Sequence, residues 1–198
     1  MHDMPTVMTH NYDPQRGSLQ NLCSLSRADA EALLSEIRYS GRSGLKLNYL
    51  ERRLATERWL LDERTLRLGA PRLRHPLYFF LGDFADGLDP SRPASLVMPL
   101  AVLPADTVTF TYPDSMASFP LHTEGRDVRE RKPYHGQVFT LAEIEQVVAT
   151  FGLPGERWKT DPSMRHDRFI EVQVWDDRPV RDYLAKHESR RSPSPSFA

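Results

Sequence analysis

The strongest constraint on the fold is a change of hydrophobic period along the chain. Residues 45–69 carry leucines at helical spacing and end at a glycine, as a long helix does. From residue 75 onward the apolar runs are short, partly β-branched and interrupted by Gly and Pro, which is typical of strands. Helices grouped early and strands grouped later favour an α+β fold, with helices mainly in the N-terminal half, over a doubly wound sheet.

The same patterns predict the individual elements. We expect helices at residues 27–41, 45–69, 140–152 and 179–187, and strands at 21–26, 75–83, 94–103, 106–112 and 168–177. Thr140, with Glu143 three residues later, forms a capping box at the start of one helix. We expect residues 118–136 to be a polar loop, residues 1–18 to be loosely ordered, residues 19–187 to form a single domain and residues 188–198 to be a disordered tail.

Length and charge exclude several classes of protein. A chain of 198 residues fits one hydrophobic core, and 39% hydrophobic residues are enough to fill it. Lys and Arg number 26 against 27 Asp and Glu, so the formal net charge is −1 and no global field attracts nucleic acid or an anionic membrane. A net charge near zero does not exclude a local basic patch on the surface.

The cysteine and histidine patterns argue against disulfides and metal. Cys23 is the single cysteine, which excludes an internal disulfide and suits a reducing compartment. The 7 histidines show no HxxxH or HExxH spacing, so we predict no metal site. The first residues lack the order of a secretory signal, and no stretch approaches the roughly 18 apolar residues of a membrane span. We expect a cytoplasmic protein that does not bind membranes.

One carboxylate stands in the middle of the strongest predicted strand. Alternation places Ile170, Val172 and Val174 on one face and Phe169, Glu171 and Gln173 on the other. A glutamate in an apolar strand costs desolvation energy unless it is paired or faces a cleft. Glu171 is therefore either a catalytic carboxylate or a residue of a half-solvated face, paired with an arginine.

Two further positions have a functional and a structural interpretation. Arg53 borders the leucine stripe of the helix at 45–69; there it either holds a phosphate group or pairs with Glu57 at i,i+4 spacing. Tyr78 lies in a predicted strand, where its ring either stacks on a planar ligand or belongs to the core.

Three segments resemble the DNA-modifying ADP-ribosyltransferase toxins of bacterial toxin–antitoxin pairs. They are PLYFF with the Gly-containing loop after it, TVTFTYPDSMASF, and WKTDPSMRHDRFIEVQVWDDRPVRDYL. In the last segment an acidic–aliphatic–x–Val strand, Glu171 to Val174, is followed by the turn at Arg178–Val180 and the pair Tyr183–Leu184. NLCSL with ADAEALLSEI is also similar to the opening strand and helix of such folds.

The resemblance implies an ADP-ribosyltransferase-like split sheet with a central cleft and NAD as donor substrate, without metal. By the match, Glu171 is the catalytic glutamate of the last strand. Arg53 or Arg52 is implied as the cation on the NAD diphosphate, and Tyr78 as the ring near nicotinamide. The acceptor is implied to be a nucleic-acid base or end, and a toxin implies a neutralising antitoxin partner.

One residue of the family pattern is missing where it is expected. Relatives place a histidine in the first strand to hold the NAD ribose, whereas residues 21–26 contain none. Ser24 or His10 is the candidate substitute. The alternative functions are a binding module that kept this fold without its chemistry, and an enzyme of different chemistry on an unrelated α+β scaffold.

Overall fold

The protein combines one antiparallel sheet with helices on both of its faces. The computed structural model describes residues 3–41, 45–84, 91–123, 131–164 and 166–188. The strands are β1 (Val7–Tyr12), β2 (Leu77–Leu81), β3 (Ala94–Pro99), β4 (Val108–Thr111), β5 (Val138–Phe139) and β6 (Glu171–Val174). The α-helices are α1 (Arg27–Tyr39), α2 (Tyr49–Leu68), α3 (Ser115–Thr123), α4 (Leu141–Phe151) and α5 (Arg178–Glu188).

The six strands form one sheet in the order β3-β1-β2-β6-β4-β5, and every neighbouring pair is antiparallel. The expected α+β class is confirmed. The helices, however, are not gathered in the N-terminal half, because α3, α4 and α5 all follow β4.

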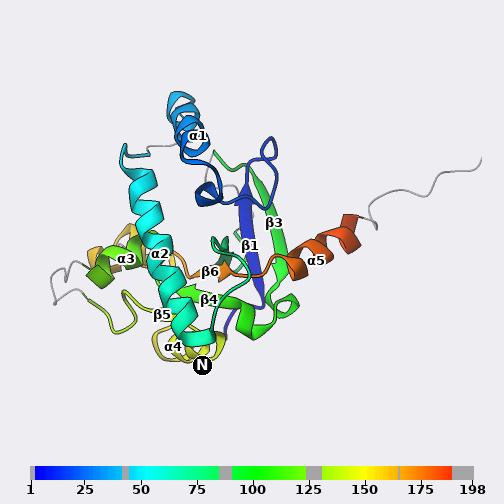
Figure 1. The fold of residues 1–198 in the computed structure, drawn as a ribbon. Coiled ribbons are helices and arrows are strands. Elements are labelled where there is room, and N and C mark those ends of the chain that lie inside the picture. Colours follow the sequence, from blue (N-terminus) through cyan, green and yellow to red (C-terminus); the bar gives the residue numbers. More distant parts are fainter. Residues whose placement is uncertain (1–2, 42–44, 85–90, 124–130, 165, 189–198) are drawn as a thin grey trace, which may run out of the picture.

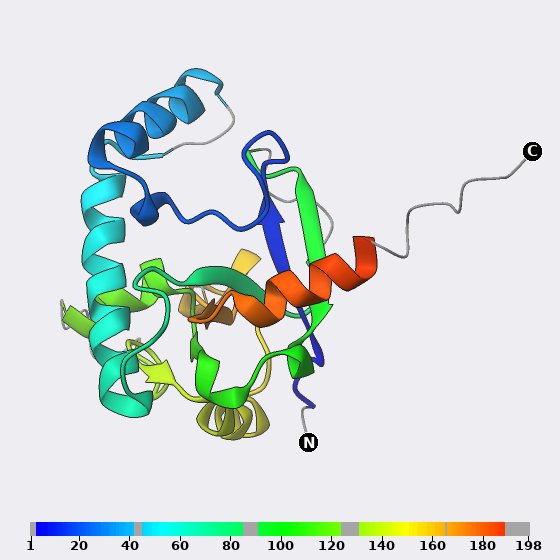
Figure 2. The ribbon, with the colours of Figure 1, turned by 45° about the vertical axis from the view of Figure 1, so that its right-hand side comes forward.

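The two faces of the sheet differ in chemistry. One face carries the main apolar core, in which Phe79, Phe110 and Val172 pack with Ile144 of α4 and Val180 of α5. The other face lies under α2, where the apolar contacts are confined to a smaller cluster around Trp59 and Trp175. Figure 2 shows α2 on one side of the molecule and α5 crossing in front of β1 and β3 on the other.

The sheet is divided between β1 and β2. β1 pairs with β3 along its whole length, from Val7 to Tyr12, but with β2 only at Met8 and Thr9. In Figure 1, β1 and β3 run steeply while β4 and β6 lie across them. The strands of the two halves therefore separate beyond Thr9, which leaves backbone groups of β2 without strand partners.

The segment expected to be loosely ordered contains an inner strand of the sheet. Residues 7–12 form β1, and the polar residues Thr9, His10 and Asn11 are buried in it. Polar side chains at consecutive buried positions hide the alternation that marks a strand, so the sequence pattern missed it.

Three other expectations were wrong in detail. Residues 21–26 contain a 3₁₀ turn, η1 (Leu22–Ser24), instead of a strand, because the Asn21 side chain accepts a hydrogen bond from the Cys23 amide and caps the turn. Part of the expected loop at 118–136 belongs to α3, which starts beside the main-chain carbonyl of Asp114. The predicted strand at 94–103 ends at Pro99, where a 3₁₀ turn follows.

The predicted capping box of α4 is confirmed, because Thr140 and Glu143 exchange hydrogen bonds at its start. Helix α1 is capped by Ser26, whose side chain accepts a hydrogen bond from the Asp29 amide. The strand that contains Glu171 is present as β6. Among the described residues, none of the helices combines the length and apolar character that crossing a bilayer requires.

A buried ion cluster joins the segment before β5 to the segment before β6. Asp167 is 0% exposed and accepts hydrogen bonds from Tyr134 (3.0 Å), His135 Nε2 (2.7 Å) and the Lys132 ammonium group. Burial raises the pKa of Asp167, but His135 and Lys132 outweigh it and hold this pKa below its ordinary value. The cluster therefore stabilises the fold while Asp167 is ionised.

We predict that Asp167→Asn lowers the free energy of unfolding by about 3 kcal/mol, because it leaves buried donors without a charged acceptor. In the wild type this stabilisation is complete above a pH of about 4, the unfolded-state pKa, and is lost as the pH falls through the lower folded-state pKa. Urea unfolding at several pH values measures both effects. Asp62→Asn, at an exposed position, is the control; equal losses in the two variants would contradict the prediction.

Candidate functional site

Helix α2 brings buried charges as well as apolar residues to the sheet. Arg53, Glu57 and Arg64 are all buried on its inner side, whereas Leu47, which was expected in the apolar stripe, lies before the helix and is 84% exposed. Arg53 and Glu57 are one turn apart and form an ion pair of 3.4 Å between Nε and Oε1. A charge removed from water must be paired, so this helix face requires charged and polar partners from the sheet.

Glu171 supplies the second carboxylate of this face. It is 5% exposed, and its strand neighbours at the same level are Phe80 on β2 and Thr111 on β4. Its Oε1 accepts hydrogen bonds from the Ser115 amide (3.3 Å) and from Gln173 Nε2 (3.1 Å). Among the described residues none donates a hydrogen bond to Oε2, so these contacts hold the carboxylate through one oxygen.

A chain of hydrogen bonds fixes the orientation of Glu171. The Trp175 indole donates to Thr109 Oγ1 (2.8 Å), and that hydroxyl donates to Gln173 Oε1 (3.0 Å). The amide of Gln173 then donates to both Thr111 and Glu171. All five side chains are buried on one sheet face, so the Glu171 carboxylate has little freedom to rotate.

Arg53 connects Glu171 to Tyr78. Its guanidinium carbon lies 3.7 Å from the centre of the Tyr78 ring, within cation–π range. Its Nη1 donates to Ser115 Oγ (3.4 Å), and Ser115 in turn donates its amide to Glu171. The structure thus brings Arg53, Tyr78 and Glu171 into one cluster, which we call the candidate site.

Glu57 closes the other side of the cluster. Its Oε1 accepts hydrogen bonds from Tyr78 (2.9 Å) and Asn21 Nδ2 (2.9 Å), and its Oε2 lies 2.6 Å from His75 Nδ1. The pairing of Arg53 with Glu57, one of the two interpretations of the sequence, is real; it does not exclude contact of Arg53 with the site, because the guanidinium also reaches Tyr78 and Ser115.

The pKa values of the two carboxylates are shifted in opposite directions. Burial raises the pKa of Glu57, but His75, Arg53 and Asn21 together hold it below its ordinary value. Burial also raises the pKa of Glu171; there the charge of Arg53 opposes the shift, the nearby Asp114 adds to it, and the net pKa is raised. Glu57 is therefore a stable counter-ion, whereas Glu171 gives up its proton reluctantly, as a carboxylate poised for chemistry does.

Arg53 itself is held charged. Its burial lowers its pKa, but Tyr78, Tyr49, Glu171 and Glu57 outweigh the burial and raise it. The Tyr78 phenol is neutral, because burial raises its pKa well above the ordinary value. The site therefore presents one fixed cation beside a carboxylate.

His10 lies in the true first strand, but not beside Glu171. Its Nδ1 donates to the Tyr78 carbonyl (2.7 Å), which lies where the β1–β2 ladder has ended, and its ring packs on Phe79 at 5.0 Å on the apolar side of the sheet. Burial lowers the pKa of His10, so the ring is neutral. Its Nε2 is buried and has no hydrogen-bond partner among the described residues, although the Ser18 main chain lies nearby.

The remaining sequence candidates are not part of the cluster. Ser24 is exposed on η1, and no described contact joins it to Glu171, because the segment expected to be the first strand is a 3₁₀ turn. Arg52 is half-buried on α2, and only its main chain makes contacts that the structure describes, to Asn48 and Thr56.

The sequence patterns did not point to Asn21 or His75, and they gave Cys23 no part in a site. Cys23, Glu57 and His75 offer one ligand atom each within 4.8 Å of one another, and they come from η1, α2 and the segment before β2. No spacing motif joins three residues that are so far apart in the chain, so only the fold could reveal this group.

A separate hollow lies away from the candidate site. Its volume is about 280 Å³, and it lies between the end of α2, β5 and α4. It is lined by Arg67, Gln137, Phe139, Glu143, Gln146, Val147, Thr150 and Phe151. None of these residues belongs to the candidate site.

Comparison of the chain with family models, curated proteins and solved structures found no match. The geometry of the described residues is therefore the basis for any assignment of function.

We predict opposite effects on stability when each buried carboxylate is made neutral. Glu57→Gln should lower the free energy of unfolding by about 2–3 kcal/mol, because Arg53 and three other donors lose a charged acceptor. Glu171→Gln should leave stability within about 1 kcal/mol of the wild type, or raise it, because an ionised and partly unpaired carboxylate is costly to bury. Chemical denaturation at pH 7 measures both.

The pH dependence of stability distinguishes the Glu57→Gln and Glu171→Gln variants further. The folded-state pKa of Glu171 is raised, so its penalty grows as the pH rises from about 4.3, and the advantage of Glu171→Gln should grow with it. The folded-state pKa of Glu57 is lowered, so the stability that Glu57 provides is lost only as the pH falls below the same value. Parallel pH profiles of the two variants would overturn this assignment.

Proposed function

We propose that the protein is an NAD-dependent ADP-ribosyltransferase and that Glu171 is its catalytic carboxylate. One observation carries the proposal: a buried glutamate with a raised pKa, held through one oxygen only, lies beside a buried arginine that stays charged. The residues are those that the resemblance to DNA-modifying ADP-ribosyltransferase toxins implies, and the shortness of the β1–β2 ladder agrees with a split sheet.

The chemistry uses the two charges in different ways. When nicotinamide departs, the ribose develops positive charge, and Glu171 Oε2 stabilises it. The same oxygen accepts a proton from, or orients, the attacking group. Arg53 binds the diphosphate through the N–H groups that do not face Glu57. Because Arg53 covers one face of the Tyr78 ring, nicotinamide meets Tyr78 only on the other face or at its rim.

Two features of the site modify what the resemblance implies. The first-strand histidine is present as His10, but its ring is on the Phe79 side of the sheet, so its part is to hold the Tyr78 main chain instead of the ribose. Glu171 is 5% exposed, so a dinucleotide reaches it only after the surrounding segments move.

The acceptor that we favour is a nucleic-acid base or end. Arg168 lies three residues before Glu171. Its guanidinium carbon is 4.1 Å from the centre of the Trp158 ring and 5.3 Å from the centre of the Phe169 ring. A cation beside aromatic rings suits a base with its phosphate. If the protein acts as a toxin in the cytoplasm, it also requires an antitoxin partner.

The second candidate is a binding module without catalysis. It is favoured by the mutual satisfaction of the buried charges, since Arg53 already contacts Glu57, Tyr78 and Ser115. The two functions differ in whether NAD is cleaved.

We predict that the wild type releases nicotinamide from labelled NAD and that Glu171→Gln slows this release by roughly 100-fold or more, because the amide cannot stabilise the ribose cation. Glu143→Gln, on α4, should behave as the wild type does. Equal rates for the wild type and Glu171→Gln would eliminate the proposal and leave the binding module.

Neighbouring arginines offer a matched test of donor binding. Arg53→Lys should raise the KM for NAD by about tenfold, because a lysine keeps the charge but loses the planar, two-pronged contact with a diphosphate. Arg52→Lys, one position earlier on α2, should leave the KM unchanged. If Arg52→Lys has the larger effect, the diphosphate site is on the other side of the helix.

A further inference from the structure

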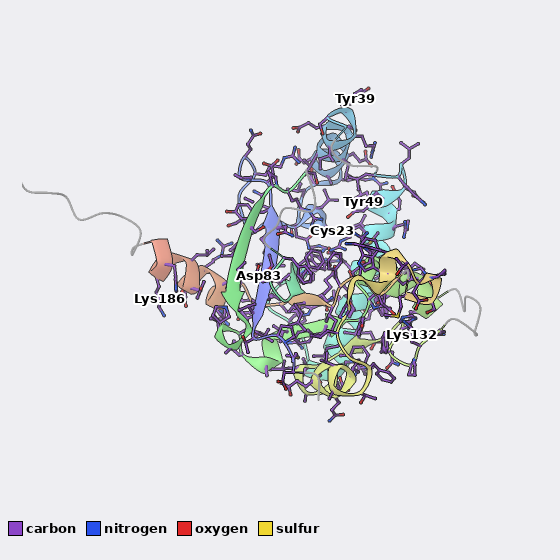
Figure 3. The ribbon with its side chains drawn as sticks, turned by 180° about the vertical axis from the view of Figure 1, so that it is seen from behind. Cys23, Tyr39, Tyr49, Asp83, Lys132 and Lys186 are labelled. Atoms are coloured by element: carbon purple, nitrogen blue, oxygen red, sulfur yellow. The ribbon has the colours of Figure 1, made fainter. Side chains whose placement is uncertain are left out.

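Three metal-ligating side chains from separate segments meet behind the candidate site. Cys23 Sγ, a Glu57 carboxylate oxygen and a His75 ring nitrogen lie within 4.8 Å of one another. Cys23 and Glu57 are buried, while the His75 side chain is 24% exposed and gives a route from solvent. Figure 3 shows Cys23 in the interior between α2 and β1.

One buried amide ties the three segments together. Asn21 accepts a hydrogen bond from the Cys23 amide (2.7 Å), donates to Glu57 Oε1 (2.9 Å) and donates to the carbonyl of Pro76, next to His75 (2.7 Å). An outer residue that orients every ligand-bearing segment is a usual feature of metal sites. The ligands are thus placed by the fold and not by chance proximity of mobile side chains.

The two oxygens of Glu57 face different partners. Oε1 accepts from Asn21 and Tyr78 and pairs with Arg53, whereas Oε2 lies 2.6 Å from His75 Nδ1. A cation between Oε2, the imidazole and the thiol would therefore leave the contacts of Oε1 with the candidate site intact.

We propose that Cys23, Glu57 and His75 form a binding site for a zinc ion, in contrast to the absence of a metal site that the histidine spacing predicted. Thiolate, imidazole and carboxylate are the three ligand types that zinc takes in proteins, and a tetrahedral ion with three protein ligands keeps a fourth position for water. Distances of about 2.3 Å to sulfur and 2.0–2.2 Å to nitrogen and oxygen place two tetrahedral ligand atoms about 3.4 Å apart. Cys23 Sγ therefore closes in on the ion, whereas His75 Nδ1 and Glu57 Oε2, now 2.6 Å apart, separate as the ion enters between them.

The ligand set also balances the charge of the ion. Zinc deprotonates a coordinating thiol. Thiolate and carboxylate then neutralise the two positive charges of the ion, so the buried group carries no net charge of its own.

Binding requires a defined movement of protons. The Cys23 S–H bond breaks and its proton leaves to solvent as the Zn–S bond forms. Because His75 Nδ1 donates to Glu57 in the metal-free form, its proton shifts to Nε2 when Nδ1 becomes a ligand. Zinc binding therefore releases the Cys23 proton, and the affinity rises with pH.

The first test is direct binding of zinc alone, which does not depend on NAD cleavage. The full chain, treated with chelator and dialysed against micromolar zinc, should retain about one ion per chain by elemental analysis, with a raised melting temperature. Cobalt(II) in its place should give the intense near-ultraviolet band of a thiolate-to-cobalt transition. Retention of well under one ion per chain, or a cobalt complex without that band, would overturn the proposal.

Single substitutions test which side chains bind the zinc ion. Cys23→Ser and His75→Ala should lose the ion, and Asn21→Ala should weaken binding by about 10–100-fold with all three ligands present. His187→Ala, an exposed histidine on α5, is the matched control and should bind as the wild type does. Circular dichroism establishes that each variant is folded; if Cys23→Ser does not fold, His75→Ala, at a half-exposed position, decides. Undiminished zinc binding in folded His75→Ala would place the metal elsewhere and overturn the site.

Discussion

Pairing of the buried charges under α2 is the constraint on which the rest of the structure depends. Arg53 and Glu57 lie on the inner side of that helix, where each needs a partner of opposite charge or a hydrogen bond. Their partners come from β2, the turn at Asn21 and the start of α3. Satisfying two charges thus fixes how the helix lies on the sheet, and the same contacts position Tyr78 and Glu171 at its centre.

The division of the sheet has a chemical consequence. Where β1 leaves β2, the Tyr78 carbonyl is bound by the imidazole of His10 in place of a strand amide. Tyr78 is therefore held on three sides: by His10 at its main chain, by Glu57 at its hydroxyl and by Arg53 on its ring. A residue fixed in this way is suited to positioning a ligand, because little conformational entropy is left to lose on binding.

Glu57 and Glu171 are buried near the same sheet face in different environments. Glu57 collects donors on both oxygens and stays ionised, so it organises the network; its carboxylate also connects this network to Cys23 and His75. Glu171 is held through a single oxygen and has a raised pKa. Such an unbalanced environment costs stability, and proteins keep it where a charge has to act on a ligand.

The sequence by itself determined the α+β class, helices α1, α2 and α4, the glycine that ends α2, the capping box of α4 and the strand that carries Glu171, because these depend on local periodicity and capping. It also pointed to Arg53 and Tyr78. Only the tertiary structure decided that β1 is an inner strand, that His10 faces Phe79, and that Asn21, Cys23 and His75 meet at Glu57. The reason is physical: a buried polar residue is stable only with partners, and those partners come from segments that are distant in the chain.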